Sequence, residues 1–146
     1  MTTVRDVMTA NPCTCSAHAT LQEVARKMLD EDVGFIPLMD KGRIAGVITD
    51  RDLAVRATAK GVDPRKARAI AFGTERAETV AADADVDEAI RLMEHWQIRR
   101  LLVVEGERPV GVVSLGDLAE ATPRQAEEVL VEVSKSPRTL AHVHRA

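Results

Sequence analysis

Hydrophobic residues recur at helical spacing in two stretches of the chain, and each stretch begins with a capping residue. In the first, Thr20 and Glu23 have the spacing of a capping box. In the second, Asp85 is the expected capping residue, and Glu88 lies three positions after it. The apolar residues that share one helical face are Leu21, Val24, Ala25, Met28 and Leu29 in the first stretch and Val86, Ala89, Ile90 and Met93 in the second. The pattern therefore predicts two amphipathic helices, the first ending near Asp32.

Each predicted helix is followed by two short apolar runs that flank a polar turn. The runs and turns are 35–39, 40–43 and 44–48 in the first half and 101–104, 105–108 and 110–113 in the second. Runs of this length around turn residues predict paired strands, and Pro37 inside the first run indicates an edge strand or a strand start. Thr49 and Ser114 then open further helices, the first of them extending to Ala59.

Two further helices are predicted outside these elements. Asp63-Pro64 has the pattern of a helix start and predicts a short basic helix over 65–70. Thr122-Pro123 begins an amphipathic helix that runs to Ser134 and has no counterpart in the first half. The tail to Ala146, with its two histidines His142 and His144, is expected to be frayed.

The elements recur because the sequence itself is duplicated. Sliding the chain by 65 positions (111 minus 46) aligns residues 9–57 with residues 74–122 without a gap. The identical pairs include Thr9/Thr74, Glu23/Glu88, Met28/Met93, Gly46/Gly111, Val47/Val112, Asp52/Asp117 and Leu53/Leu118. We therefore expect a first unit over 1–62, a second unit over 63–121, and a C-terminal helix and tail over 122–146.

Composition and charge narrow the classes of partner. Aromatic residues are scarce, with one Trp, two Phe and no Tyr, which argues against a surface that stacks single-stranded nucleic acid. The net charge of −3 argues against a phosphate-backbone partner. No stretch approaches the roughly 20 apolar residues of a membrane span, and the first residues are not an apolar signal region. We expect a cytoplasmic protein that binds neither nucleic acid nor membrane.

Reactive residues do not form a catalytic pattern. Cys13 and Cys15, with nearby His18, make an incomplete set of zinc ligands. The favoured interpretation is that the cysteines are two small apolar side chains on an extended segment. A redox role is left open. His95, like the other histidines, has no motif partner at a suitable spacing. The sequence shows neither a Ser/His/Asp constellation nor a Gly-rich phosphate loop, so we expect no enzymatic activity.

The repeated segments at 46–53 (GVITDRDL) and 111–118 (GVVSLGDL), with the opening VRDVMT at 4–9, resemble the CBS domain family. The resemblance covers roughly residues 1–121 and is to a tandem pair, also called a Bateman module. The linker Gly61-Val62-Asp63-Pro64 is similar to that of short, stand-alone pairs of the hypoxic response type. The resemblance to the family implies an α/β (α+β) fold, in which two β-α-β-β-α units form a pseudo-twofold pair. Such pairs are usually homodimers. In this chain the C-terminal helix is added to the pair.

The resemblance also implies a regulatory module that senses AMP, ADP or ATP between its two units and signals to an unknown protein target. Asp52 and Asp117 would hold ribose hydroxyls, helped by Thr49 and Ser114, since a carboxylate at a helix start can accept from both hydroxyls. Basic side chains would reach the phosphates. The implied phosphate contacts are Arg51, Arg99 and Arg100, and the implied adenine contacts are Ile36, Pro37, Leu101, Leu102, Thr14, Cys15, Thr79 and Val80.

Two alternatives stay open at this point. The Thr49/Asp52 and Ser114/Asp117 pairs are also good helix caps, which need no ligand. The halves are unequal as well, because Gly34 and Phe35 align with the two arginines. One cleft could therefore be empty, or the chain could be a ligand-free stress or assembly protein that acts through its dimer and C-terminal helix surfaces. Nicotinamide and S-adenosyl ligands are further options.

Overall fold

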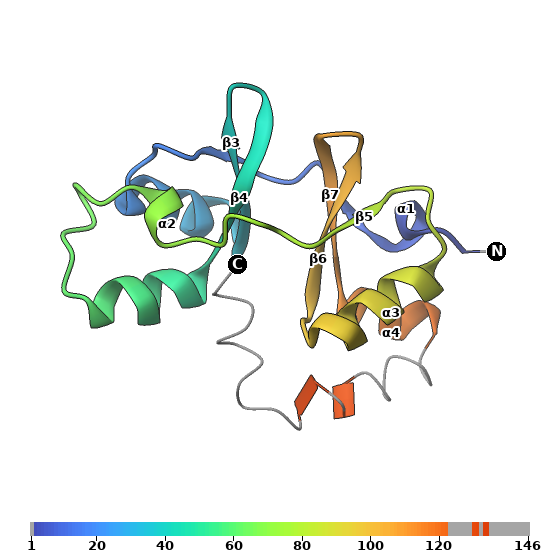
Figure 1. Ribbon diagram of the computed structural model, residues 1–146. Helices are drawn as coiled ribbons and strands as arrows, with labels where there is room; N and C mark the ends of the chain where they lie inside the picture. The colour runs from blue at the N-terminus through green and yellow to red at the C-terminus, as the bar shows by residue number, and fades with distance from the viewer. Residues whose placement is uncertain (1, 123–129, 132, 135–146) are drawn as a thin grey trace. The chain divides into compact units, whose positions relative to one another are not determined.

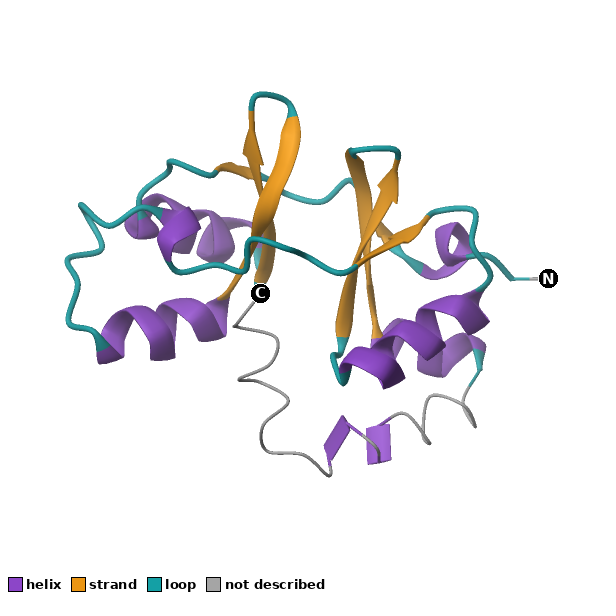
Figure 2. Ribbon diagram, viewed as in Figure 1, coloured by secondary structure: helices purple, strands orange, loops and turns teal. Residues whose placement is uncertain are grey.

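The computed structural model describes residues 2–122, 130, 131, 133 and 134, which fall into two compact units (Figure 1). The contiguous unit spans Cys13–Ala77. The split unit combines the N-terminal residues up to Pro12 with the chain from Glu78 onward. Each unit is a small sheet with helices packed against it, so the mixed α+β class is confirmed (Figure 2).

The contiguous unit has a three-stranded sheet in the order β2-β3-β4. Strand β2 is parallel to β3, and β3 and β4 form an antiparallel hairpin. Its core is made by Leu21, Val24 and Met28 from α2 against Ile36, Leu38 and Ile48 from the hairpin. The elements are β2 (Cys15–Ser16), α2 (Leu21–Glu31), β3 (Phe35–Asp40), β4 (Arg43–Thr49), the π-helix η1 (Asp52–Ala57) within a helical stretch at 50–59, and the 3-10 helix η2 (Ala69–Ala71).

The split unit has a four-stranded sheet in the order β1-β7-β6-β5. Only β5 and β6 are parallel neighbours, while β7 is antiparallel to both β6 and β1. Val86 and Met93 of α3 pack with Leu101, Val103 and Val113 of the sheet. The elements are α1 (Val4–Val7), β1 (Thr9–Ala10), β5 (Thr79–Ala81), α3 (Val86–Trp96), β6 (Arg100–Glu105), β7 (Arg108–Ser114) and α4 (Leu115–Ala121).

Each unit is completed by the segment that precedes the other repeat. In the split unit Val4 N donates to Ala84 O at 2.8 Å, and in the contiguous unit Ala69 N donates to Ala19 O at 2.8 Å. These contacts lie 65 positions apart at both ends (69 minus 4, 84 minus 19), so they are equivalent. The pairing of Thr9 with Val112 recurs in the same way as a bridge between Thr74 and Val47.

This exchange of segments explains why the units differ from the expected bounds of 1–62 and 63–121. The first twelve residues add a helix and a strand to the second repeat, and residues 63–77 close the first. Local sequence patterns favoured a boundary between Val62 and Asp63, because they indicate where turns lie and not which segments pair. Which repeat a flanking segment pairs with is a long-range property.

The predicted basic helix over 65–70 is wrong. Asp63 holds a single turn, in which its Oδ1 accepts from Arg65 N at 3.0 Å and its carbonyl accepts from Lys66 N and Ala67 N. Arg68 is then extended, with φ −92° and ψ 143°. Pairing with residues 17–20 requires this extended backbone, and the helical stretch is thereby reduced to the three residues of η2.

The position predicted for the strand with Pro37 is also wrong. Strand β3 lies between two strands rather than at the edge, and Pro37 is its third residue rather than its start. The missing N–H of Pro37 costs little at this position. On one side, the ladder with β2 includes only Leu38 and Met39. On the other side, the opposing residue Val47 directs both backbone groups to Thr74, at 2.9 and 2.8 Å. Neither neighbour therefore needs a donor from Pro37.

The C-terminal helix predicted from Thr122 to Ser134 lies mostly outside the described residues. Residues 130, 131, 133 and 134 are helical, and Val133 is buried in the core of the split unit. His142 and His144 are outside the described residues. None of the helices in the described part of the chain has the length and hydrophobicity of a membrane-spanning segment.

Candidate functional site

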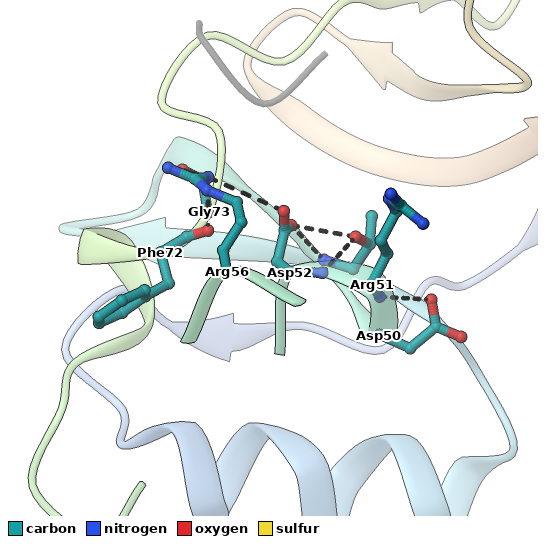
Figure 3. A network of polar contacts seen from close by, with 7 residues as sticks. Asp50, Arg51, Asp52, Arg56, Phe72 and Gly73 are labelled. Carbon is teal, nitrogen blue, oxygen red and sulfur yellow. Dashed lines mark hydrogen bonds and ion pairs between the residues drawn. The ribbon is translucent and has the colours of Figure 1, made fainter. Parts of the chain in front are cut away.

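Two matching boxes place an aspartate where a strand turns into a helix. At the end of β4, Thr49 N and Oγ1 donate to Asp52 Oδ2 at 2.8 and 3.0 Å, and Asp52 N donates to Thr49 Oγ1 at 3.2 Å (Figure 3). At the end of β7, Ser114 N donates to Asp117 Oδ2 at 2.8 Å, and Asp117 N donates to Ser114 Oγ at 3.1 Å. The cap thus uses only the Oδ2 atom of each aspartate. What the Oδ1 atom contacts depends on the neighbouring side chains.

The second carboxylate oxygen distinguishes the two boxes. Asp52 is only 1% exposed, and its Oδ1 lies 3.8 Å from Arg56 Nη1 in an ion pair. Asp117 is half-buried, and within the described part of the chain no donor binds its Oδ1. The box of the split unit therefore presents an acceptor to solvent, whereas the box of the contiguous unit is closed by its own side chains.

The strand beside each box carries different chemistry. In the split unit, Arg99 O accepts from Leu115 N at 2.8 Å and Arg100 is the β-ladder partner of Ser114. Both arginines are exposed. In the contiguous unit the same positions are Gly34, whose carbonyl accepts from Asp50 N at 3.0 Å, and Phe35. The backbone of two exposed arginines therefore lies beside the start of the helix that carries Asp117.

A single predicted phosphate contact, Arg51, accompanies the box of the contiguous unit. Its backbone N–H donates to Asp50 Oδ1 at 2.9 Å, and its side chain is exposed. Figure 3 shows the Arg51 and Asp50 side chains leaving the helix in different directions. Arg51 is therefore the one predicted phosphate contact at this helix start, and the Asp50 carboxylate points away from it.

The predicted adenine contacts lie on several faces. Ile36, Leu101 and Val80 belong to the cores of their units, and this packing explains their burial without a ligand. Leu102 and Pro37 point to the opposite face of their strands, since successive residues alternate. Thr79 is the ladder partner of Leu102, and Cys15 pairs with Leu38. Thr14 directly precedes β2. As ligand contacts, all eight stay predictions.

The cysteines lie on the extended segment that leads into β2, as expected. Burial raises the pKa of both thiols, and the charge of Lys27 only partly opposes this. His18 is 3.6 Å from Asp40 Oδ1 and on the surface. No group of three potential metal ligands forms among the described residues. The structure therefore supports the interpretation of Cys13 and Cys15 as largely apolar side chains.

Both thiols are expected to react slowly with Ellman's reagent at neutral pH. A raised pKa means a smaller fraction of the reactive thiolate at that pH, so the rate should increase as the pH rises through and beyond the ordinary thiol range. Absorbance of the released chromophore measures the rate. The unfolded chain in concentrated guanidinium is the control. Native thiols that react as fast as unfolded ones would contradict the burial argument.

Sequence reasoning missed Arg56. Its Nη1 donates to Phe72 O at 2.7 Å and to Gly73 O at 3.3 Å, in addition to its ion pair with Asp52 (Figure 3). The available signal was a basic residue four positions after the box aspartate, where the second repeat has Ala121. The backbone acceptors that give Arg56 its role leave no mark in the sequence.

Comparison with known families finds one match that covers most of the chain. The sequence profile of the CBS domain matches twice, at residues 4–57 and 69–124. Hypoxic response protein 1 of Mycobacterium tuberculosis is 36% identical over 142 residues, which cover 97% of this chain and 99% of the relative. The CBS domain-containing protein YhcV of Bacillus subtilis is 40% identical over 119 residues, which cover 82% and 84%.

Solved structures show the same architecture. Hypoxic Response Protein I, crystallised with two coordinated zinc ions, has a TM-score of 0.73 and 36% identity, and the match covers 83% of this chain and 99% of that one. The CBS domain pair of protein MJ0100, in complex with 5′-methylthioadenosine and S-adenosyl-L-methionine, has a TM-score of 0.74 and 25% identity, with 86% and 98% covered.

Proposed function

Because this chain belongs to the CBS domain family and carries two copies of the domain, we propose that it senses an adenosine-containing ligand and signals its presence to a protein target. The module itself is of the regulatory, ligand-binding kind. The observation that carries the finer proposal is the half-buried carboxylate of Asp117, whose Oδ1 atom is left over by the cap. We further propose that the chain acts as a homodimer.

The chemistry around Asp117 suits a nucleotide. A carboxylate oxygen beside a strand end can accept hydrogen bonds from ribose hydroxyls, and such charge-assisted bonds are stronger than neutral ones. Arg100 begins the neighbouring strand β6 and Arg99 directly precedes it. Arginine binds phosphate oxygens with two parallel N–H donors. The complex of the MJ0100 pair with two adenosine derivatives supports the nucleoside part of the ligand. The two arginines favour AMP, ADP or ATP over an uncharged adenosine.

Asp117→Ala is expected to weaken the binding of adenine nucleotides, because it removes the ribose acceptor. A hydrogen bond to a charged group contributes about 1.5–3 kcal/mol, so affinity should fall at least about tenfold. Isothermal titration with AMP, ADP, ATP and S-adenosylmethionine measures it. Asp52→Ala is the matched variant in the other box, and nucleotide affinity should be retained there. Unchanged affinity in Asp117→Ala would refute the site assignment.

The zinc binding of the similar structure is not supported by the described residues of this chain. The described residues bring no three His, Cys, Asp or Glu side chains together, although one similar structure holds two coordinated zinc ions. We therefore do not include zinc in the proposed function.

A second candidate is ligand-free assembly through the C-terminal helix. Val133 is 5% exposed, whereas Leu130 and Val131 are 43% and 51% exposed. One side of this helical segment thus packs into the split unit and apolar side chains remain outside it. Truncation after Ala121 separates the candidates. Assembly predicts loss of self-association with no response to nucleotide, whereas the sensor retains nucleotide binding if the split unit stays folded.

A further inference from the structure

Asp52 and Asp117 occupy equivalent positions in the repeat, but among the described residues only the Asp52 carboxylate of the two forms an ion pair. Arg56 Nη1 lies 3.8 Å from Asp52 Oδ1, and the Arg56 side chain is 29% exposed while that of Asp52 is 1% exposed. In the second repeat the position of Arg56 is taken by Ala121, which cannot approach a carboxylate. The Arg56 side chain therefore has no equivalent in the second repeat.

Backbone carbonyls anchor the Arg56 guanidinium. Its bonds to Phe72 O, at 2.7 Å, and to Gly73 O, at 3.3 Å, hold it over the box (Figure 3). The carbonyls are themselves fixed, because the neighbouring Thr74 exchanges two backbone hydrogen bonds with Val47, at 2.8 and 2.9 Å. A Cβ added at Gly73 would lie 2.5 Å from Val47 O, so the backbone there is in close contact with β4. Arg56 is thus part of a rigid arrangement.

The helix that carries Arg56 differs from its counterpart as well. Residues Asp52–Ala57 form a π-helix, whereas α4 in the second repeat is an α-helix. Thr58 Oγ1 bonds to Leu53 O at 3.1 Å, five residues earlier. Single π-helical turns are uncommon and are found mostly at functional positions. This turn is the segment that carries both Asp52 and Arg56.

We propose that Arg56 is an internal occupant that closes the box of Asp52, so that the chain binds a single nucleotide, at Asp117. A ligand at Asp52 would have to take an oxygen that already pairs with Arg56, and would leave that guanidinium to its two carbonyls alone. This inference rests on the proposed function, because it concerns which of two nucleotide sites is open.

The stoichiometry of ATP binding to the full chain tests the proposal. By isothermal titration we expect one site in the wild-type chain and two in Arg56→Ala, which reproduces the residue of the second repeat. Arg56→Gln keeps an amide donor for the carbonyls of 72 and 73 without the charge, and should also show two sites. Arg56→Lys keeps a cation and should retain one.

Asp52→Ala in the Arg56→Ala background should return the count to one, because it removes the newly opened acceptor. Circular dichroism and thermal unfolding establish that each variant is folded. If Arg56→Ala fails to fold, Arg56→Gln carries the test. A wild-type chain that binds none of AMP, ADP, ATP and S-adenosylmethionine would overturn the proposed function itself. Two sites in the wild type, or one site in folded Arg56→Ala and Arg56→Gln, would overturn the closure while leaving the nucleotide sensor in place.

Discussion

Valine in place of Gly46 is expected to destabilise the contiguous unit strongly. A Cβ at this position would overlap the carbonyl oxygen of Thr74 and lie 3.1 Å from the Cα of Glu75. Both neighbours are backbone, and Thr74 is held by its two hydrogen bonds to Val47. Relief of the overlap therefore breaks the bridge that closes the unit. Overpacking of about 1–3 kcal/mol, plus about 1 kcal/mol for each lost hydrogen bond, gives a loss of about 3–5 kcal/mol.

Urea unfolding followed by circular dichroism measures this loss as a lower midpoint. Gly116→Ala is the control, because its added Cβ would meet only Ser114 Oγ, at an ordinary contact distance of 3.5 Å. We expect that substitution to change stability by less than about 1 kcal/mol, since alanine also favours a helix. A wild-type midpoint for Gly46→Val would show that residues 74 and 75 do not pack against β4 in solution.

Reversal of charge at Arg99 and Arg100 is expected to remove the preference for phosphorylated ligands. Arg99→Glu combined with Arg100→Glu changes two cations beside the Asp117 box into two anions. Loss of even two charge-assisted bonds of about 1.5–3 kcal/mol each corresponds to a drop in ATP affinity of at least about 100-fold. The affinity for 5′-methylthioadenosine, which has no phosphate, should change little.

Titration at two salt concentrations measures the effect, because phosphate contacts weaken as salt screens them. Arg91→Glu combined with Arg108→Glu is the matched control, with the same change in net charge on exposed residues of the same unit, Arg91 in α3 and Arg108 at the hairpin turn. An equal loss in both double variants would point to the overall charge of the chain rather than to phosphate contacts at the box.

Helices α2, α3 and α4 were predictable because their information is local. Thr20 caps α2 through a hydrogen bond from Glu23 N, at 3.2 Å, and the apolar residues behind it face one side. The four hairpin strands β3, β4, β6 and β7 were predicted for a similar reason, since turn residues bound each apolar run. The exchange of flanking segments was not predictable. Thr9 pairs with Val112, and no pattern near either residue indicates a partner so far along the chain.

The candidate site was predictable where it depends on local or repeated sequence, and not where it depends on long-range contacts. Asp52 and Asp117 stood out because they repeat in register, and the structure gives both the same cap. Strand alternation alone did not tell which face of β3 or β6 is the core, so Ile36 and Leu101 were included with residues of the opposite face. Arg56 was overlooked because a basic residue on an amphipathic helix is usually solvated. Its partners are carbonyl groups, which every residue has.

The exchange of segments also orders events during synthesis. The contiguous unit is complete once Ala77 has left the ribosome, and it can fold while the rest is being made. The strand at Thr9–Ala10 must wait for β7, which lies about 100 residues later, and its closure is entropically slow. The nascent chain therefore carries an unpaired N-terminal strand beside an already folded neighbour until the last third of the protein emerges.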